Sequence, residues 1–202
     1  MSRYTGPTTK INRRFNQAIL PTSKGEERKP YPPGIHGQTK SRKVSEYGQG
    51  LSEKQKLRFM YGLNERQFRL AFARAKSLGG VAGENFLRIL ETRLDNVVFR
   101  AGFAKSRDMA RQLVTHGHFV VNGHKVNIPS YRVSPNDIIE VRQGSRELTP
   151  FIVAHAEIGE RTVPAWLEVI PSQMRILVHS LPARAVIDTQ VNEQLIVELY
   201  SK

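Results

Sequence analysis

Apolar positions with a helical period form two clusters within residues 51–78. In the second cluster Phe68, Phe72 and Ala75 lie on one face, at spacings of four and three residues. Gly62 separates the clusters, and the pattern predicts two consecutive helices. The predicted helix starts are the capping boxes SEKQ, residues 52–55, and NERQ, residues 64–67.

A third helix is predicted over residues 84–101. Phe86, Leu90 and Leu94 keep the helical period of about 3.6 residues, so this stripe is expected to be core. Gly102 supplies the C-terminal stop, since glycine adopts the left-handed conformation that ends many helices.

The pattern then changes from helical to β. Ser106 is a good N-cap for a further helix, which Gly117 ends. Asn122-Gly123 lies between the β-prone runs FVV and HKV, and an NG pair in that setting is a strong hairpin signal. Residues 137–142 partly alternate apolar and polar side chains. This part of the chain is therefore expected to fold as helices followed by a small sheet.

Residues 143–202 combine short apolar pieces with polar linkers. Residues 163–169 are aromatic and β-prone, and Trp166 is expected to be a core anchor because its flanks are not basic. A short apolar piece follows at residues 175–179. Residues 192–200 carry apolar side chains at helical spacing and predict a terminal helix.

Residues 1–50 have few regular apolar positions and several Gly and Pro breaks, so they cannot bury enough surface to fold alone. Two interpretations stay open: a disordered tail, or a basic arm that becomes ordered when its charges meet phosphate. The aromatic residues interleaved with its cations favour the arm, because such rings can stack on bases. They are Tyr4, Phe15, Tyr31 and Tyr47.

Positive charge is concentrated in the first 120 residues. The chain has 202 residues and a formal net charge of +13. Residues 1–60 carry a net charge of +9, residues 61–120 carry +5, and residues 121–202 carry −1. The basic part indicates a polyanionic partner, and the neutral part indicates a structural or protein-contacting role.

The cations on the first two predicted helices are expected to contact phosphate. Lys54, Lys56 and Arg58 crowd the first helix, and only Glu53 and Glu65 are nearby acids. A charged helix face is commonly just a solvated surface. Because carboxylates are scarce here, extensive salt bridging is not expected, and contact with phosphate is favoured over a merely solvated surface.

A pair of arginines in the next helix suggests a phosphate clamp. Arg107 and Arg111 are four residues apart and so point the same way. No carboxylate of that helix lies at a matching spacing, and two guanidiniums on one face suit a phosphate group. The alternative is that Arg107 pairs with Asp108 or another nearby acid.

Residues 92–142 resemble the small RNA-binding domain named after small-subunit ribosomal protein four. The resemblance rests on RLDNV (93–97), ARQLV (110–114), HGH (116–118), VNG (121–123), VNIPSYRV (126–133) and DII (137–139). Outside this block the chain is similar to the bacterial form of that ribosomal protein family over nearly its whole length. The carrying segments are RYTGP (3–7), PGIHG (33–37), SEYG (45–48), EKQK (53–56), YG (61–62), ERQF (65–68) and NEQLIVELYSK (192–202).

This resemblance implies a primary binder of small-subunit (16S-type) rRNA. Members of the family hold a multi-helix junction in the 5′ domain and nucleate assembly of the subunit body. They contact small-subunit ribosomal protein five and influence translational accuracy. Some lie at the channel through which mRNA enters, and some repress their own mRNA. The implied location is the ribosome in the cytoplasm.

No metal or other cofactor is expected. Many relatives carry zinc-binding cysteines near the N-terminus, but this chain has no cysteine. His116, His118 and His124 lack a carboxylate to complete a metal site. His116 is expected to donate to a phosphate or to cap its helix.

An enzyme is not expected. The sequence holds no nucleophile elbow, P-loop or dinucleotide fingerprint. Asp95 lies in a helical segment, where capping or a local salt bridge is expected, and the chain leaves no room for an appended catalytic domain. A free RNA chaperone or mRNA regulator stays open. No membrane partner is expected, because no apolar run approaches the roughly 20 residues of a span.

The expected fold is α+β, with an extended basic N-terminal arm, a helical domain and an inserted small αα-plus-β-hairpin RNA-binding domain. The expected divisions are the arm (1–50), the helical domain (51–91, completed by 190–202), the small RNA-binding domain (92–155) and a neutral β-rich segment with a terminal helix (156–202). The residues expected to bind rRNA are Arg3, Tyr4, Arg13, Arg14, His36, Lys54, Lys56, Arg58, Arg66, Arg69, Lys105, Arg107, Arg111, Gln112 and His116.

Overall fold

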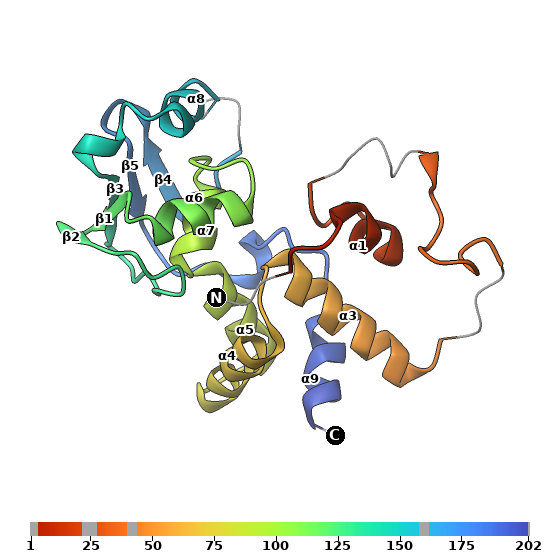
Figure 1. Ribbon diagram of the computed structural model, residues 1–202. Helices are drawn as coiled ribbons and strands as arrows, with labels where there is room; N and C mark the ends of the chain where they lie inside the picture. Colours follow the sequence, from red (N-terminus) through yellow and green to blue (C-terminus); the bar gives the residue numbers. More distant parts are fainter. Residues whose placement is uncertain (1–3, 22–27, 40–43, 158–161, 202) are drawn as a thin grey trace. The chain divides into compact units, whose positions relative to one another are not determined.

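The structure is a computed structural model that describes residues 4–21, 28–39, 44–157 and 162–201 (Figure 1). The chain forms two compact units. Unit 1 is Met1–Gly83 with Thr189–Lys202, and unit 2 is Glu84–Asp188. In the described residues unit 1 is helical, and unit 2 combines helices with an antiparallel sheet. The α+β prediction is confirmed.

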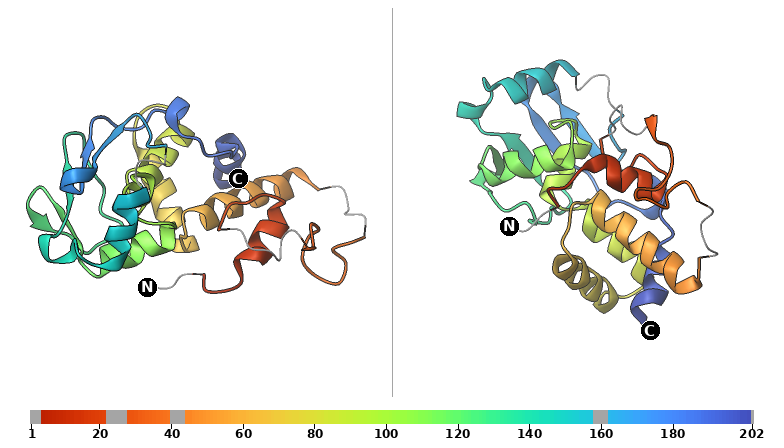
Figure 2. Two further views of the ribbon diagram at one scale, coloured as in Figure 1. Left: turned by 90° about the horizontal axis from the view of Figure 1, so that it is seen from above. Right: turned by 45° about the vertical axis from the view of Figure 1, so that its right-hand side comes forward.

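The helices of unit 1 are α1 (Thr8–Phe15), α3 (Glu46–Met60), α4 (Glu65–Ser77) and α9 (Glu193–Ser201). Helices α3 and α9 lie side by side in Figures 1 and 2. They cross closely at Gly50, where an added Cβ would stand 3.2 Å from the carbonyl oxygen of Leu195. The C-terminal segment is therefore packed against the first long helix of its unit.

One of the two predicted helix starts in this unit is confirmed. Asn64 caps α4, since its side chain accepts a hydrogen bond of 2.8 Å from the Gln67 amide. The start expected at Ser52 was wrong. Helix α3 begins six residues earlier at Glu46, where the Ser45 side chain accepts from the Gly48 amide. Packing of the early turns against α9 supports this longer helix.

The N-terminal arm is not extended throughout, because Thr8–Phe15 forms helix α1. Asn12 of this helix is buried and ties down the chain that follows. Its Oδ1 accepts from the amides of Ile19 and Leu20, and its Nδ2 donates to the Leu20 carbonyl at 2.9 Å. One satisfied amide side chain thus gives this segment local order that apolar periodicity did not reveal.

The helices of unit 2 are α6 (Leu94–Arg100), α7 (Arg107–Thr115) and α8 (Thr149–Glu157), together with most of α5 (Ala82–Glu91). Its strands are β1 (Phe119–Val121), β2 (His124–Lys125), β3 (Ile138–Val141), β4 (Leu167–Ile170) and β5 (Arg175–Val178). They form an antiparallel sheet in the order β2-β1-β3-β5-β4.

The continuous helix expected over residues 84–101 was wrong, because α5 ends at Glu91 and α6 starts at Leu94. Arg93 between them has an extended backbone and forms an isolated bridge with Arg132. The Leu94 amide donates to the Tyr131 carbonyl at 2.8 Å. Pairing with this distant loop breaks the helix although the apolar period continues through the break.

The hairpin and its preceding helix agree with the sequence signals. Asn122 and Gly123 have φ values of 49° and 81°, both left-handed, as the tight turn between β1 and β2 requires. Ser106 caps α7 by accepting from the Met109 amide at 3.2 Å. Gly117, with φ of 73°, ends the helix.

The division expected between residues 155 and 156 does not separate parts of this fold. Strands β4 and β5 continue the sheet that the hairpin begins, because β5 pairs with β3. Trp166 is only 3% exposed in the shared core, which confirms the prediction that it is a core anchor. Residues from both sides of the expected division thus form one hydrophobic core.

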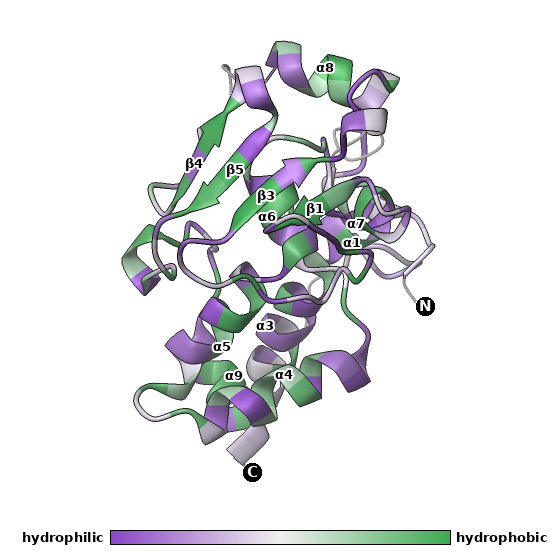
Figure 3. Cartoon of the chain, turned by 90° about the vertical axis from the view of Figure 1, so that its left-hand side faces the viewer, coloured by the Kyte–Doolittle hydropathy of each residue, from purple (hydrophilic) through white to green (hydrophobic). Residues whose placement is uncertain are grey.

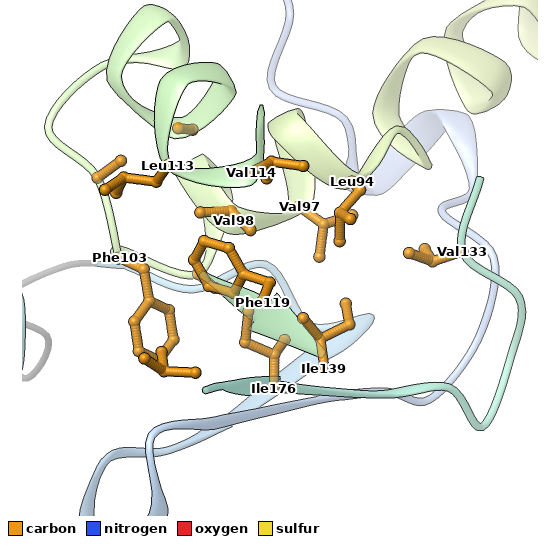
Figure 4. Close-up of a cluster of buried hydrophobic side chains, with 14 of the residues drawn as sticks. Leu94, Val97, Val98, Phe103, Leu113, Val114, Phe119, Val133, Ile139 and Ile176 are labelled. Carbon is orange, nitrogen blue, oxygen red and sulfur yellow. The ribbon is translucent and has the colours of Figure 1, made fainter. Parts of the chain in front are cut away.

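The core of unit 2 lies between the sheet and helices α6 and α7 (Figure 4). Phe119, Ile139 and Ile176 point from the strands toward Val98 and Val114 of the helices. Each such side chain contributes about 1.5–3 kcal/mol when it is fully buried. Figure 3 looks onto the opposite face of β3, β4 and β5. Ile138 alternates along β3 with the buried Ile139 and is 41% exposed.

Candidate nucleic-acid interface

A buried ionic cluster joins α6 to α7. The Asp95 carboxylate accepts from Arg93 at 2.8 and 3.0 Å and from Arg111 at 2.8 and 3.0 Å. It also accepts from the backbone amide of Asn96 at 2.9 Å, within the first turn of α6. Asp95 is 2% exposed and Arg111 is 8% exposed. Of the two expected roles of Asp95, capping or a local salt bridge, the structure shows the salt bridge.

The predicted phosphate clamp assumed that neither Arg107 nor Arg111 has a carboxylate partner, and for Arg111 this assumption was wrong. Arg111 already has a carboxylate partner, and that partner lies on another helix. Asp95 is 16 residues away along the chain, so the spacing rules within one helix do not detect it. Burial of a guanidinium also requires such a partner, because an unpaired buried charge is very costly.

Arg107 is held differently, at the half-buried edge of the same helix. Its Nε donates to Asn96 Oδ1 at 2.8 Å, and its guanidinium carbon lies 4.5 Å from the centre of the Phe99 ring. Asn96 in turn donates to the Glu91 carboxylate at 2.7 Å. The amide therefore orients Arg107, while the ring supplies a flat surface for its guanidinium.

The Glu91 carboxylate also pairs with Arg100 at 2.8 Å, and Arg100 reaches Asp188 at 2.6 Å. The hydrogen bond from Arg100 lowers the pKa of Asp188 below its ordinary value. Burial opposes this change, and the charges of Arg100 and Arg107 reinforce it. The lowered pKa keeps the Asp188 carboxylate ionised, and the network neutralises part of the charge counted in the sequence.

A second set of paired cations joins the helices of unit 1. Lys54 is 8% exposed and contacts Glu65 at 2.7 Å, and Arg58 lies 3.8 Å from the same carboxylate. Lys56 lies 3.6 Å from Glu53. The expectation of little salt bridging on α3 was wrong. Glu65 stands in the first turn of the next helix, and one carboxylate there serves two cations.

Tyr200 of α9 completes this cluster by donating to Glu65 at 3.1 Å. Burial by itself would raise the pKa of Glu65, but Lys54, Tyr200 and Arg58 outweigh burial and lower it. Burial and the charge of Glu65 raise the pKa of Tyr200, so the phenol stays protonated as a donor. The C-terminal helix is thus tied to α4 by a hydrogen bond to a charged group.

Cations without a carboxylate partner in the described residues line the outer face of α4. Arg66, Arg69 and Lys76 share one face of this helix and are all exposed. The contact of Arg66 and Arg69 with RNA stays a prediction.

The arm residues contact their own unit. Arg13 donates to the Tyr31 carbonyl at 2.9 Å, with its guanidinium 5.0 Å from the Tyr31 ring. Tyr4 packs edge-on against Phe59, with ring centres 5.3 Å apart. Arg14 and His36 are exposed. Arg3 lies outside the described residues. The aromatic rings of Tyr4 and Tyr31 in the arm therefore pack against other residues of unit 1.

A second exposed group surrounds the end of α7. Gln112 and His116 are exposed there, as expected of residues offered to a ligand. Lys105, at the other end of the helix, is 60% exposed by its side chain and pairs with Glu157 at 2.7 Å. Lys125 and Arg142 are also exposed, and the sequence interpretation missed both. For Lys125 a usable signal existed, since no Asp or Glu occurs from residue 109 to residue 136, but Arg142 lies outside that stretch.

The residues that the structure describes contain neither a cluster of metal-ligating side chains nor a membrane-spanning helix. No group of three or more His, Asp or Glu side chains is arranged to hold a metal ion. In the same part of the chain no helix is both long and apolar enough to cross a membrane.

A helix pair, an NG hairpin and a closing strand, with exposed cations around them, define the S4 class of RNA-binding domain. The model of the "S4 domain" matches residues 92–139, and that of the "Ribosomal protein S4/S9 N-terminal domain" matches residues 3–91. The chain is 61% identical to small ribosomal subunit protein uS4 of Acidothermus cellulolyticus, and 59% identical to that of Saccharopolyspora erythraea. Both matches cover all of each chain. The chain belongs to the uS4 family of ribosomal proteins.

Proposed function

We propose that this chain is a structural constituent of the small ribosomal subunit that binds small-subunit rRNA. The observation that carries the proposal is identity of 55–61% to uS4 proteins along the whole length of the chain. Those relatives are named as ribosomal proteins and not as enzymes, which supports a binding role without catalysis. Ribosomes of bacteria such as these relatives are cytoplasmic, and we expect this chain there.

The proposed rRNA contacts are made by exposed cations, while the buried ion pairs build the framework. The exposed Arg66 and Arg69 on α4 are suited to phosphate, and so is the half-buried Arg107 on α7, since their guanidiniums offer several donors in a fixed plane. Gln112 and His116 extend the contact at the end of α7. Further exposed candidates from the predicted set are Arg14, His36 and Lys105.

The proposed mechanism combines charge with shape. Each cation that meets a phosphate releases counterions, so affinity falls steeply as salt rises. Side chains cannot read the deep groove of A-form RNA, so specificity comes from the shape of the RNA. By family resemblance the target is a multi-helix junction in the 5′ domain, and binding there nucleates assembly of the subunit body.

The protein partner proposed by resemblance is small-subunit ribosomal protein five, and through it translational accuracy is influenced. The neutral charge of residues 121–202 supports a protein contact in that part of the chain. The exposed apolar side chains Leu181 and Val186, at 42% and 40%, are suited to such a contact. Contact with mRNA near its channel, and repression of its own mRNA, are proposed on the same resemblance.

The experiment that tests the function is a salt-series titration of the purified chain with two RNAs. One is a small-subunit 5′-domain RNA, and the other is an unrelated structured RNA of equal length. Much tighter binding of the first at physiological salt is expected. Equal binding of both, fading together with salt, would instead indicate a general RNA chaperone. Co-sedimentation with small subunits provides an independent check.

A further inference from the structure

His118 lies at a junction of three elements beside the end of α7. It follows Gly117 and precedes β1. Its Nδ1 lies 3.0 Å from the Ser145 hydroxyl, and its ring centre lies 5.9 Å from that of Phe151 on α8. The ring of His116 is 6.0 Å away. The imidazole is therefore fixed on one side by Ser145 and Phe151.

Two cations are brought to this histidine by the sheet. The Arg142 amide donates to the His118 carbonyl at 2.8 Å, which places Arg142 beside it at the end of β3. Lys125 of β2 lies across Gly117, where an added Cβ would overlap the Lys125 stem and stand 3.1 Å from its Nζ. Gly117 thus leaves the space in which the ammonium group lies.

The charges around His118 are all of one sign. The charged groups that act on it are His116 from α7, Arg142 from the end of β3 and Lys125 from β2. Within the described residues no carboxylate pairs with Lys125 or Arg142. Burial, followed by these three cations, lowers the pKa of His118 below 6.5. A group of cations without a counter-charge has the composition of an anion site.

We propose that His118, Lys125 and Arg142, with His116 at the rim, bind one backbone phosphate of RNA, and that binding is coupled to proton uptake by His118. This inference rests on the proposed function, since it assigns a further contact to the same RNA. The phosphate supplies the missing negative charge. It offsets the repulsion among the cations and so favours the protonated imidazole.

The Ser145 hydroxyl suits both protonation states of the ring. It donates to Nδ1 of the neutral imidazole and accepts from Nδ1–H of the charged one, because a hydroxyl can rotate between the two roles. Nε2–H then faces the phosphate in both states, and the proton taken from solvent goes to Nδ1. No other group needs to move for the site to change charge.

The test is a titration with 5′-domain RNA at about pH 7.5 and about pH 5.5, on either side of the ordinary histidine pKa of about 6.5. Affinity should rise at the lower pH, by up to about tenfold for each unit by which RNA raises the His118 pKa. His118→Gln should remove that rise. Lys125→Gln with Arg142→Gln should weaken binding at both pH values and reduce the salt slope by about 2.

The control is His179→Gln. His179 pairs with Glu168 at 2.8 Å beside the other edge of the same sheet, so this variant should keep the pH dependence. Circular dichroism of each variant checks the fold. If wild type binds the 5′-domain RNA selectively but His118→Gln has the same pH dependence, the site is wrong and the proposed function stands. If wild type does not discriminate between the RNAs, the proposed function itself fails.

A measurement on wild type alone keeps the proposal testable if His118→Gln does not fold. NMR titration of the histidine rings should show a higher His118 pKa with RNA bound than without. An unchanged or lower value overturns the proposal. Inorganic phosphate added to the free protein should raise this pKa less than RNA does. An equal rise would assign the site to free phosphate rather than to RNA.

Discussion

Helix α7 carries two kinds of positive charge. Near its middle, Arg111 is buried and held by Asp95 of α6. At its C-terminal end, His116 is exposed beside Lys125 and Arg142, which have no carboxylate partner in the described residues. The first group fixes how two helices pack, and the second is available to a polyanion. The net charge counted from the sequence includes both groups of cations and does not distinguish between them.

The largest loss of stability should come from removing the carboxylate of Asp95, which pairs with the buried Arg111. Asp95→Ala leaves Arg111 and Arg93 without their carboxylate, and loss of one partner of a buried pair costs about 3–5 kcal/mol. Urea unfolding measures the change in the free energy of unfolding. Asp108→Ala is the matched control, because Asp108 is an exposed acid in the first turn of α7 and should cost less than about 1 kcal/mol. Similar losses in both variants would contradict a special role of Asp95.

A smaller effect is expected from the paired group of unit 1. Tyr200→Phe removes the hydrogen bond to Glu65, and bonds to charged groups contribute about 1.5–3 kcal/mol. Tyr200 is only half-buried, so the loss should lie at the lower end of that range. The exposed Tyr47 provides the control, and Tyr47→Phe should leave the free energy of unfolding unchanged within about 0.5 kcal/mol. A neutral Tyr200→Phe would mean that the bond adds nothing to stability.

Substitution of the exposed cations of α4 should weaken RNA binding while leaving the stability of the fold nearly unchanged. Arg66→Gln with Arg69→Gln should change the free energy of unfolding by no more than about 0.5 kcal/mol, yet reduce the salt slope of RNA binding by about 2. Arg175→Gln is the comparison, since Glu140 already pairs with that arginine. An unchanged salt slope in the double variant would exclude α4 from the RNA contact.

The smallest expected effect concerns stability without RNA. The pKa of His118 is lowered, first by burial and then by His116, Arg142 and Lys125. A lowered folded-state pKa stabilises the fold at a pH above the unfolded value of about 6.5. That contribution is lost as the pH falls through the folded-state pKa. Wild type should therefore lose more stability than His118→Gln between about pH 7.5 and about pH 5.5 in urea unfolding. Equal losses would show that His118 does not titrate in this way.

Features decided within a few residues could be predicted from the sequence. The Asn122-Gly123 turn and the Asn64 and Ser106 caps were found because each signal and its effect lie in one turn of chain. The family resemblance was also readable, since its segments are spread along the whole sequence. These local signals were sufficient for the α+β class and for the hairpin of unit 2.

Features decided between distant segments could not be predicted in the same way. Asp95 and Arg111 are 16 residues apart, and Glu65 and Tyr200 are 135 residues apart. The break at Arg93 depends on pairing with Arg132. Patterns of charge within a single helix therefore made Lys54 and Arg111 look free, whereas tertiary packing gives each of them a carboxylate.

The chain passes from unit 1 into unit 2 and then back into unit 1, and this affects the order in which the two units can be completed during synthesis. Residues 189–202 leave the ribosome after all of unit 2, yet they supply α9, which packs on α3. During synthesis unit 2 has its whole sequence while unit 1 still lacks its last helix. Domains generally fold as units as they emerge. The part of the chain made first therefore reaches its final structure last, when Tyr200 meets Glu65.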